Sequence, residues 1–238
     1  MAVHSRRIGG SLAFWETHRH RIIDGFGVNV LKYFEDFESV PIASDAIDGW
    51  TTTLVEMGCG ESTVARTDLP GGAILITTDD AENDGVNLQL AGESFSMAAT
   101  NQLYFGIRFQ ASEATNSDIF VGLSVTDTDA LGGVDTACYF EKLDAAATIN
   151  TVTEKDTTET TTSAVATFVV DTWTIWEFFY DGTSVYFYID GTLEATHTLN
   201  IPNDEEMTPT IHFLTGAMAA ETMTVDWVRC IEFNRNAA

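Results

Sequence analysis

The sequence predicts an all-β protein, built as one antiparallel sandwich of about 200 residues behind an extended N-terminal arm. Three observations favour this fold class. Apolar and polar residues alternate in several segments after residue 33, as they do in strands with one buried face. Two Asp-Gly pairs, at 181–182 and 190–191, stand directly between runs rich in aromatic and β-branched residues. The chain has only four prolines, and outside the arm it contains no convincing amphipathic helix.

The strands follow from this alternation in chain order. Segments 102–110 and 118–125 alternate most regularly, and the shorter segment 86–90 does the same. The last strand is expected to bury one face, with Arg229 interrupting it; that face comprises Met223, Val225, Trp227, Ile231 and Phe233. Residues 173–191 give the densest signal, because each Asp-Gly pair tolerates the positive φ angles of a tight hairpin turn.

The first 32 residues differ from the rest in charge. They carry a net charge of +3, whereas the remaining chain carries −28. Leu12, Trp15, Ile22 and Phe26 lie near helical spacing in this arm. We interpret residues 1–32 as a basic and aromatic arm that orders on a partner, and residues 33–238 as the sandwich domain; a solvated extension is the alternative. The expected partner-binding residues are Arg6, Arg7, Phe14, Trp15, Arg19 and Arg21.

Charge and composition exclude several function classes. A net charge of −25 repels phosphate backbones and anionic lipids, so we expect neither nucleic acid nor a membrane as partner. No apolar run is long enough to cross a bilayer, and no apolar segment follows the N-terminal arginines to make a secretory signal. Three scattered cysteines predict neither a disulfide framework nor a zinc site.

The C-terminal third resembles a known family. Trp173 to Gly191, Ile211-His212-Phe213 and Val225-Asp226-Trp227-Val228 together resemble the concanavalin A-like (laminin G-like) jelly roll. The aromatic and acidic stretch 33–38 is similar to that of jelly-roll proteins in tailed-phage virions. The resemblance covers residues 33–233 and implies the fold, which hosts lectins, glycanases, lyases and structural proteins alike.

Glycanases that resemble this fold carry a Glu-x-Asp-x-(x)-Glu stretch, in which two carboxyl groups flank the glycosidic bond. The chain has one such match, formed by Glu154, Asp156 and Glu159. The residues between these acids are polar, whereas in the family they are apolar and face the core. We therefore interpret the threonine-rich stretch 151–167 as a solvated hairpin, and we expect no enzymatic activity and no catalytic residue.

Two acidic loops are candidates for metal binding. Asp79 to Gly85 concentrates oxygen ligands, but Ala91 stands where an EF-hand needs its bidentate glutamate. Asp127, Asp129 and Asp135 form the second loop. We interpret both loops as solvated turns and expect no metal and no cofactor; a calcium ion at the sandwich rim is the alternative.

These observations lead to three hypotheses of function. The first is a non-enzymatic virion structural protein, a decoration (cement) protein that bridges and stabilises major capsid subunits. Made in the host cytoplasm and displayed on the outer capsid surface, it would have the major capsid protein and copies of itself, as a dimer or trimer, as partners. The second is a carbohydrate-binding, lectin-like module of a phage fibre. The third is a glycanase that uses Glu154, Asp156 and Glu159.

Overall fold

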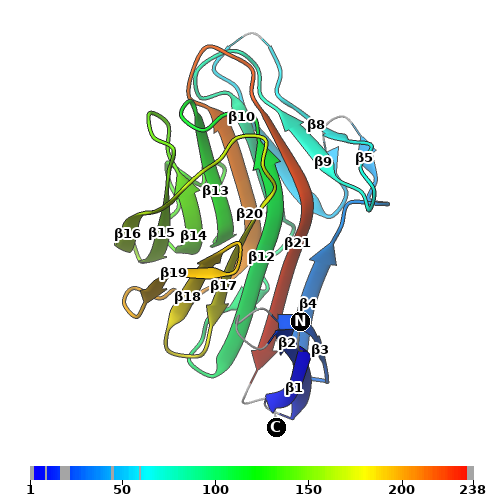
Figure 1. Cartoon of the computed structure of the whole chain (residues 1–238), viewed down its shortest axis with the longest axis vertical. Helices are drawn as coiled ribbons and strands as arrows, with labels where there is room; N and C mark the ends of the chain where they lie inside the picture. Colours follow the sequence, from blue (N-terminus) through cyan, green and yellow to red (C-terminus); the bar gives the residue numbers. More distant parts are fainter. Residues whose placement is uncertain (1–2, 9, 17–21, 44–45, 59, 235–238) are drawn as a thin grey trace.

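The computed structural model describes residues 3–8, 10–16, 22–43, 46–58 and 60–234. All regular elements in these ranges are strands, and every paired strand runs antiparallel to its neighbour. Two eight-stranded sheets pack face to face, and the long strands β12 and β21 run through most of the molecule's length (Figure 1). The predicted all-β jelly-roll sandwich is therefore confirmed. The described residues include no helix long and apolar enough to cross a membrane.

The first sheet contains the predicted strands 86–90 and 118–125. Its strands in spatial order are β16 (Thr158–Thr167), β15 (Thr148–Lys155), β14 (Ala137–Lys142), β13 (Ser117–Ser124), β20 (Glu206–Thr215), β10 (Gly85–Leu90) and β7 (Trp50–Val55), with β11 (Phe95–Ser96) beside β20.

The second sheet contains the predicted strand 102–110 and both Asp-Gly turns. Its strands in spatial order are β19 (Thr192–His197), β18 (Val185–Ile189), β17 (Thr174–Tyr180), β12 (Asn101–Ala111), β21 (Thr222–Asn234), β9 (Ile74–Thr77) and β8 (Thr63–Arg66), with β4 (Val30–Glu35) beside β21. A two-stranded ribbon of β5 (Ile42–Ala43) and β6 (Ala46–Ile47) completes this part of the fold.

The core fills the space between the two sheets with the inward residues of each alternating strand. Trp176 is fully buried there, with its ring 4.8 Å from that of Phe109 and 5.3 Å from that of Phe140. These rings come from both sheets, so the aromatic cluster joins the two layers. The tight turn at Asp190 and Gly191 has φ of 49° and 76°, as the Asp-Gly pair predicts.

The last strand departs from its predicted alternation. A β-bulge lies opposite Arg108 and Phe109, and it leaves Asp226 as the extra residue of β21. Met223 and Val225 therefore face the core, whereas Trp227 and Arg229 point to the outer face of the second sheet. The prediction that Val225 and Trp227 share one face was wrong, because one added residue reverses the direction of every later side chain.

The N-terminal arm is built from strands rather than from the helical turn suggested by its spacing. β1 (Val3–Ile8), β2 (Ser11–Glu16) and β3 (Ile22–Phe26) form a three-stranded sheet at one end of the sandwich (Figure 1). It packs Ile8 and Ala13 against residues of the second sheet, including Phe233. Gly25 approaches the Phe233 ring so closely that a Cβ atom there would lie 2.5 Å from it. The helical expectation was wrong because the second sheet offers an apolar outer surface to a flat partner.

The predicted arm boundary at residue 32 falls inside β4, which pairs with β21 over residues 30–35. The division of the chain into a partner-binding arm and a separate sandwich domain stays a prediction.

Candidate functional site

The outer face of the first sheet gathers an unusual set of polar side chains. Register places Glu154 of β15 beside Ala137 of β14, and Glu141 of β14 in one row with Phe120 of β13 and His212 of β20. Residues in register on neighbouring strands point to the same side of a sheet. The opposite side of the same strands carries core residues such as Phe140 and Ile211, so this polar set faces outward.

Glu154 and Glu159 lie directly opposite each other on β15 and β16. The two residues between these strands, Asp156 and Thr157, have φ of 49° and 64° and form the turn. The predicted hairpin is confirmed, and the Glu-x-Asp-x-x-Glu match therefore does not line up along one strand. Asp156 is exposed at the tip, whereas the two glutamates form a cross-strand pair.

The two glutamates differ in environment. The side chain of Glu159 is exposed, whereas Glu154 is only 6% exposed. Within the described part of the chain, the Glu154 carboxyl group has no hydrogen-bond donor. Burial raises its pKa to about 7, and the negative charges of Glu159, Asp135 and Glu141 add to the effect. At neutral pH a carboxyl group with this pKa is present in both protonated and ionised forms, which suits it to donate and accept protons.

Burial also raises the pKa values of two neighbouring side chains, Glu141 and Tyr139. Glu141 accepts a hydrogen bond from the Asn150 side chain at 2.9 Å, yet burial still raises its pKa. Tyr139 stands between Glu141 and Glu154 on this face, and its ring stacks on Phe120 with centroids 4.2 Å apart. Burial and the three surrounding glutamates raise the pKa of the Tyr139 phenol.

A loop of residues 125–136, here called the covering loop, connects β13 to β14 and lies over this face. Its Ala130 and Leu131 pack against Phe120, Tyr139 and Val152. Its second end reaches the β15–β16 turn, where the Thr157 amide donates to the Asp135 carbonyl at 2.8 Å. The loop therefore links the glutamate pair to the middle of the sheet.

Two amide side chains hold the other end of the covering loop. Asn87 of β10 donates to the Asp127 carbonyl at 2.7 Å, and Gln89 accepts from the Asp127 amide at 3.0 Å. Gln89 also donates to the Val125 carbonyl at 3.2 Å. All these contacts join the loop to β10, a strand far from β13 and β14 in sequence.

His212 lies beneath this loop, fully buried, and neither of its ring nitrogens has a hydrogen-bond partner in the part of the chain that the structure describes. Its register partner Asn87 is 1% exposed and has an unpartnered Oδ1. Buried histidines in strands usually have a hydrogen-bond partner. His197 does bond to threonines, with its Nδ1 3.0 Å from the Thr153 hydroxyl, but His212 does not.

The residues predicted to bind a partner lie elsewhere. Arg6 donates to Gln102 at 3.2 Å and its guanidinium lies 4.2 Å from the Trp15 ring centroid, while Arg7 donates to the Gly10 carbonyl. The Phe14 ring is 6.2 Å from that of Phe26. Arg19 and Arg21 lie outside the described residues. The bond between Arg6 and Gln102 joins the arm to the sandwich, whereas the other contacts lie within the arm; binding of the arm to a partner stays a prediction.

The acidic loops form no metal centre among side chains. Over the described residues, no group of three or more histidine, cysteine, aspartate or glutamate side chains is arranged to hold a metal ion. Asp127 accepts from the Asp129 amide at 2.7 Å, and Asp129 accepts from the Gly132 amide at 3.2 Å. These two carboxylates brace the covering loop.

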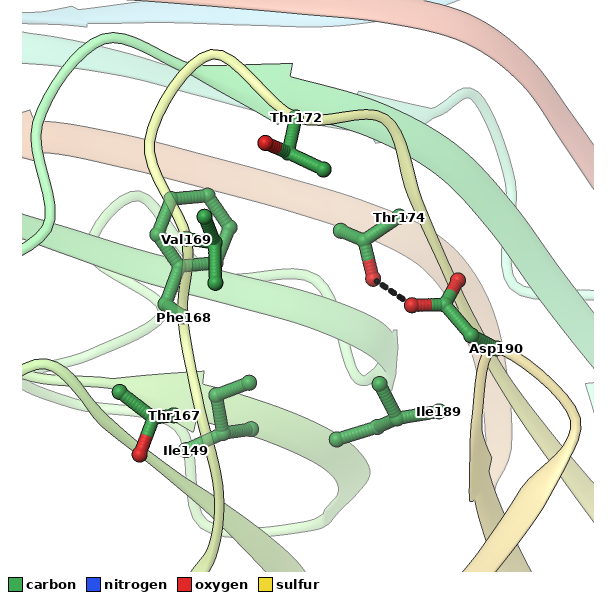
Figure 2. A pocket seen from close by; sticks show the side chains of 8 residues that line it. All are labelled: Ile149, Thr167, Phe168, Val169, Thr172, Thr174, Ile189 and Asp190. Atoms are coloured by element: carbon green, nitrogen blue, oxygen red, sulfur yellow. Dashed lines mark hydrogen bonds between the residues drawn. The ribbon is translucent and has the colours of Figure 1, made fainter.

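A cavity of about 80 Å³ opens between the sheet ends near Phe168 (Figure 2). The only carboxylate in its lining, Asp190, accepts from the Thr174 hydroxyl at 3.2 Å and from the Ile175 amide at 2.8 Å. Small-molecule sites usually measure about 300 to 1,000 Å³. The cavity is therefore too small for a sugar polymer, and its carboxylate is already engaged.

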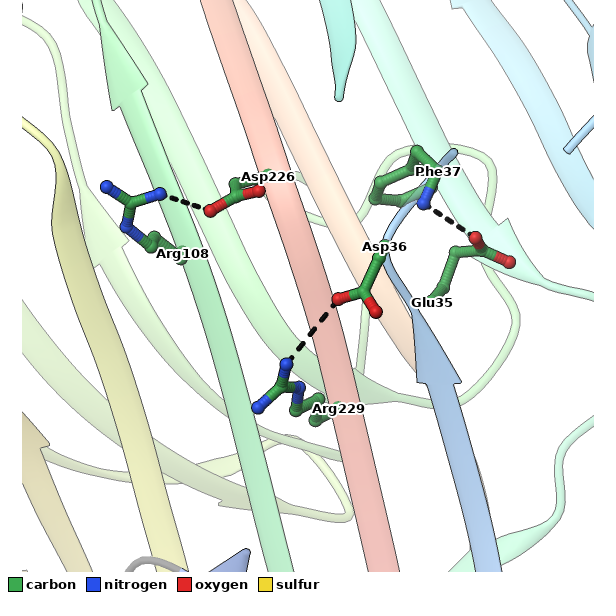
Figure 3. Close-up of polar contacts among 6 residues, drawn as sticks. All are labelled: Glu35, Asp36, Phe37, Arg108, Asp226 and Arg229. Atoms are coloured by element: carbon green, nitrogen blue, oxygen red, sulfur yellow. Dashed lines mark hydrogen bonds and ion pairs between the residues drawn. The ribbon is translucent and has the colours of Figure 1, made fainter. Parts of the chain in front are cut away.

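The outer face of the second sheet carries paired charges. Arg108 bonds to Asp226 across β12 and β21, and Arg229 lies 3.5 Å from Asp36 (Figure 3). The same guanidinium groups lie over aromatic rings, Arg108 at 4.3 Å from the Trp173 centroid and Arg229 at 4.5 Å from that of Trp227.

The architecture occurs in known enzymes. The structure is similar to an endo-1,3-β-glucanase from Streptomyces sioyaensis, with a TM-score of 0.61 over 87% of this chain and 98% of that one, at 12% identity. A β-glucanase of Bacillus licheniformis gives a TM-score of 0.59 over 83% and 96% of the two chains, at 15% identity. A non-specific endo-β-1,3(4)-glucanase from family GH16 gives 0.58 over 86% and 92%, at 11% identity. No protein-family model matches the chain, and no curated protein matches its sequence.

At such identities the likeness shows the fold, and it confirms the concanavalin A-like jelly roll. It also corrects two expectations from the sequence. The hypothesis of a non-enzymatic capsid decoration protein and the expectation of no enzymatic activity are contradicted, because the architecture matches glucanases over more than four-fifths of the chain. The sequence reasoning dismissed the glutamates of the β15–β16 hairpin because their neighbours are polar, and it missed that β14 and the covering loop bury one of them.

Proposed function

We propose that this protein is a glycoside hydrolase that cleaves β-glucan chains on the outer face of its first sheet. The observation that carries the proposal is the cross-strand pair of Glu154 and Glu159, one carboxyl group buried with a raised pKa and the other exposed. Glycoside hydrolysis needs two carboxyl groups, one protonated and one ionised, on either side of the glycosidic bond.

The spacing of the pair favours a retaining mechanism. Directly opposed residues of an antiparallel pair have Cβ atoms about 4.5 to 5.5 Å apart, so the carboxyl groups of two opposed glutamates, two bonds further out, can come within a similar distance of each other. Retaining glycosidases place their two carboxyl groups about 5 to 5.5 Å apart, whereas inverting enzymes need room for a water molecule between them. Glu154 is thus assigned as the general acid and base, and Glu159 as the nucleophile.

The reaction then has two steps. The Glu154 proton passes to the glycosidic oxygen while that oxygen leaves the anomeric carbon, and a Glu159 oxygen forms a bond to the same carbon. Water next attacks the anomeric carbon, Glu154 takes the proton from this water, and the bond to Glu159 breaks. Two displacements restore the original configuration at the anomeric carbon.

The substrate class is inferred from charge and from the similar structures. Acidic side chains dominate the site, through Glu141, Glu154, Glu159 and Asp135, and the whole chain carries −25. This charge repels uronate or sulfated chains and leaves neutral polymers as the substrate. The enzymes of similar structure are named for β-1,3- and mixed β-1,3(4)-glucans.

The test uses the full chain with soluble β-1,3-glucan and mixed-linkage β-glucan, measuring new reducing ends. Wild type is expected to release them, and Glu154→Gln is expected to lower kcat about 10² to 10⁴-fold because it cannot donate a proton. Glu159→Gln is expected to lower kcat as well, because an amide does not form the covalent intermediate. Glu194→Gln, on β19 of the other sheet, is the matched control and keeps full activity.

The product's configuration gives a second readout. Proton NMR early in the reaction is expected to show the anomer of the substrate linkage. Hydrolysis by Glu154→Gln at the wild-type rate would contradict the assignment of the acid. Tight glucan binding with no hydrolysis by wild type would instead identify a carbohydrate-binding module.

A further inference from the structure

Asn87 and His212 form a buried polar pair in which, among the described residues, only the Asn87 side-chain nitrogen has a hydrogen-bond partner. The two residues are in register on β10 and β20, on the same outer face as the glutamate pair. His212 is 0% exposed and Asn87 is 1% exposed. Over the described ranges, both His212 ring nitrogens and the Asn87 Oδ1 lack a hydrogen-bond partner. Burying such atoms unpaired costs free energy, so each such group in a native structure calls for an explanation.

We infer that Asn87 and His212 form a sugar-binding subsite for a long β-glucan chain, closed by the covering loop in the free protein and opened when the loop lifts. This inference rests on the proposed function. In the closed state the covering loop occupies the place of the sugar chain. Of the polar atoms of the pair, it forms a hydrogen bond only with the Asn87 side-chain nitrogen. The hydroxyl groups of a sugar supply both donors and acceptors for the remaining atoms.

The state of the histidine fits this ligand. Burial lowers the pKa of His212 to about 4, although the charges of Asp129 and Asp127 act in the opposite direction. The ring is therefore neutral near pH 7, with one nitrogen as a donor and the other as an acceptor. A neutral ring beside an amide oxygen matches an uncharged polyol.

The position of the pair sets the length of the ligand. Three strand spacings of about 4.8 Å separate Glu154 on β15 from His212 on β20, and four residues of about 3.4 Å separate their rows, so the two sites are about 20 Å apart. Between them lie Tyr139 and Phe120, the stacked rings that Leu131 of the covering loop packs against. A ligand that reaches from one site to the other must be a polymer of several sugars.

The covering loop has the contacts of a removable lid. It is attached at one end through the amides of Asn87 and Gln89 and at the other through the turn at Thr157. Between these points its apolar contacts come from Ala130, Leu131 and Val134. Weakening an apolar contact of the closed loop should therefore favour the open form and strengthen binding of a long chain.

The experiment measures calorimetric binding of a β-glucan disaccharide and hexasaccharide to the Glu154→Gln chain, which separates binding from hydrolysis. The hexasaccharide is expected to bind at least tenfold more tightly. Adding His212→Phe is expected to abolish this preference for length while preserving or raising Tm, because a ring of similar shape removes two unpaired atoms.

The lid variant gives a result in the opposite direction. Leu131→Ala is expected to tighten hexasaccharide binding several-fold without changing disaccharide binding, whereas Leu199→Ala, at an exposed position, changes neither. A length preference unaffected by His212→Phe, or no response to Leu131→Ala, would overturn the inference and leave the hydrolase proposal standing. A preference that depends on His212 in a protein that hydrolyses no glucan would overturn the hydrolase proposal and support the subsite.

Discussion

The outer faces of the two sheets are built by the same alternation but differ in how their polar groups are satisfied. On the second sheet, Arg108 and Arg229 each have a carboxylate partner (Figure 3). Each guanidinium group also lies over a tryptophan ring, although the Nε atom of Arg229 has no hydrogen-bond partner among the described residues. On the first sheet, the described residues provide no hydrogen-bond donor for the Glu154 carboxyl group and no partner for the His212 ring nitrogens. Paired groups lower the free energy of the folded chain, whereas unpaired groups are available to a ligand. The comparison therefore supports a stabilising role for the outer face of the second sheet and the proposed chemistry for that of the first.

The largest expected effect on stability comes from removing the N-terminal strands that cover the outer face of the second sheet. Deleting residues 1–28 removes β1 to β3 and exposes Tyr104, Phe179 and Phe233 to water. The free energy of unfolding is expected to fall by about 5 kcal/mol, since each of these three buried side chains contributes about 1.5 to 3 kcal/mol. Urea unfolding measures the loss. Val28→Ser, at a 99% exposed position, is the control, and an unchanged midpoint for the deletion would show that the N-terminal sheet does not stabilise the sandwich.

A smaller change in the free energy of unfolding, an increase rather than a loss, is expected from a substitution on the outer face of the first sheet. The pKa of Glu154 is about 7 in the folded chain and ordinarily 4.5. The protonated form therefore contributes stability that is complete below pH 4.5 and is lost as pH rises through 7. Glu154→Gln cannot ionise, so it should match wild type at pH 4 and exceed its stability at pH 8 by on the order of 2 kcal/mol. Urea unfolding at both pH values measures the difference, and equal stability at pH 8 would refute the burial of a charged Glu154.

The smallest effect tests the separation of the two roles. Trp227→Ala removes the ring beneath Arg229 and is expected to lower the free energy of unfolding by about 1 to 2 kcal/mol, from lost cation–π contact and lost burial. Glucan hydrolysis by the folded variant should equal that of wild type. A drop in kcat/KM at full folding would show that the second face also takes part in the reaction.

Much of the fold was predictable because it rests on local patterns. Residues 102–110 and 118–125 alternate, and both form strands with the expected inward residues. The Asp190-Gly191 turn follows from the φ angles that this pair tolerates. The near-helical spacing of Leu12 and Phe26 led to a wrong prediction, because β2 and β3 pair with each other and cover the second sheet.

The candidate site was less predictable. The Glu154 and Glu159 match was visible in the sequence, but its interpretation depended on whether β15 is exposed. The structure buries β15 between β14 and β16, under a loop that starts 29 residues before Glu154. His212 gave no signal, since a lone histidine in a strand has the same pattern whether or not its nitrogens find partners.

By itself, the sequence determined that the chain forms strands, where most of them lie and which of their residues face a core, because alternation with a period of two is a local property. Tertiary structure alone decided the bulge at Asp226, the partners of each outward charge and the place of the covering loop. Those features depend on register between strands far apart in the chain, and register determines which polar groups meet a partner and which stay unpaired.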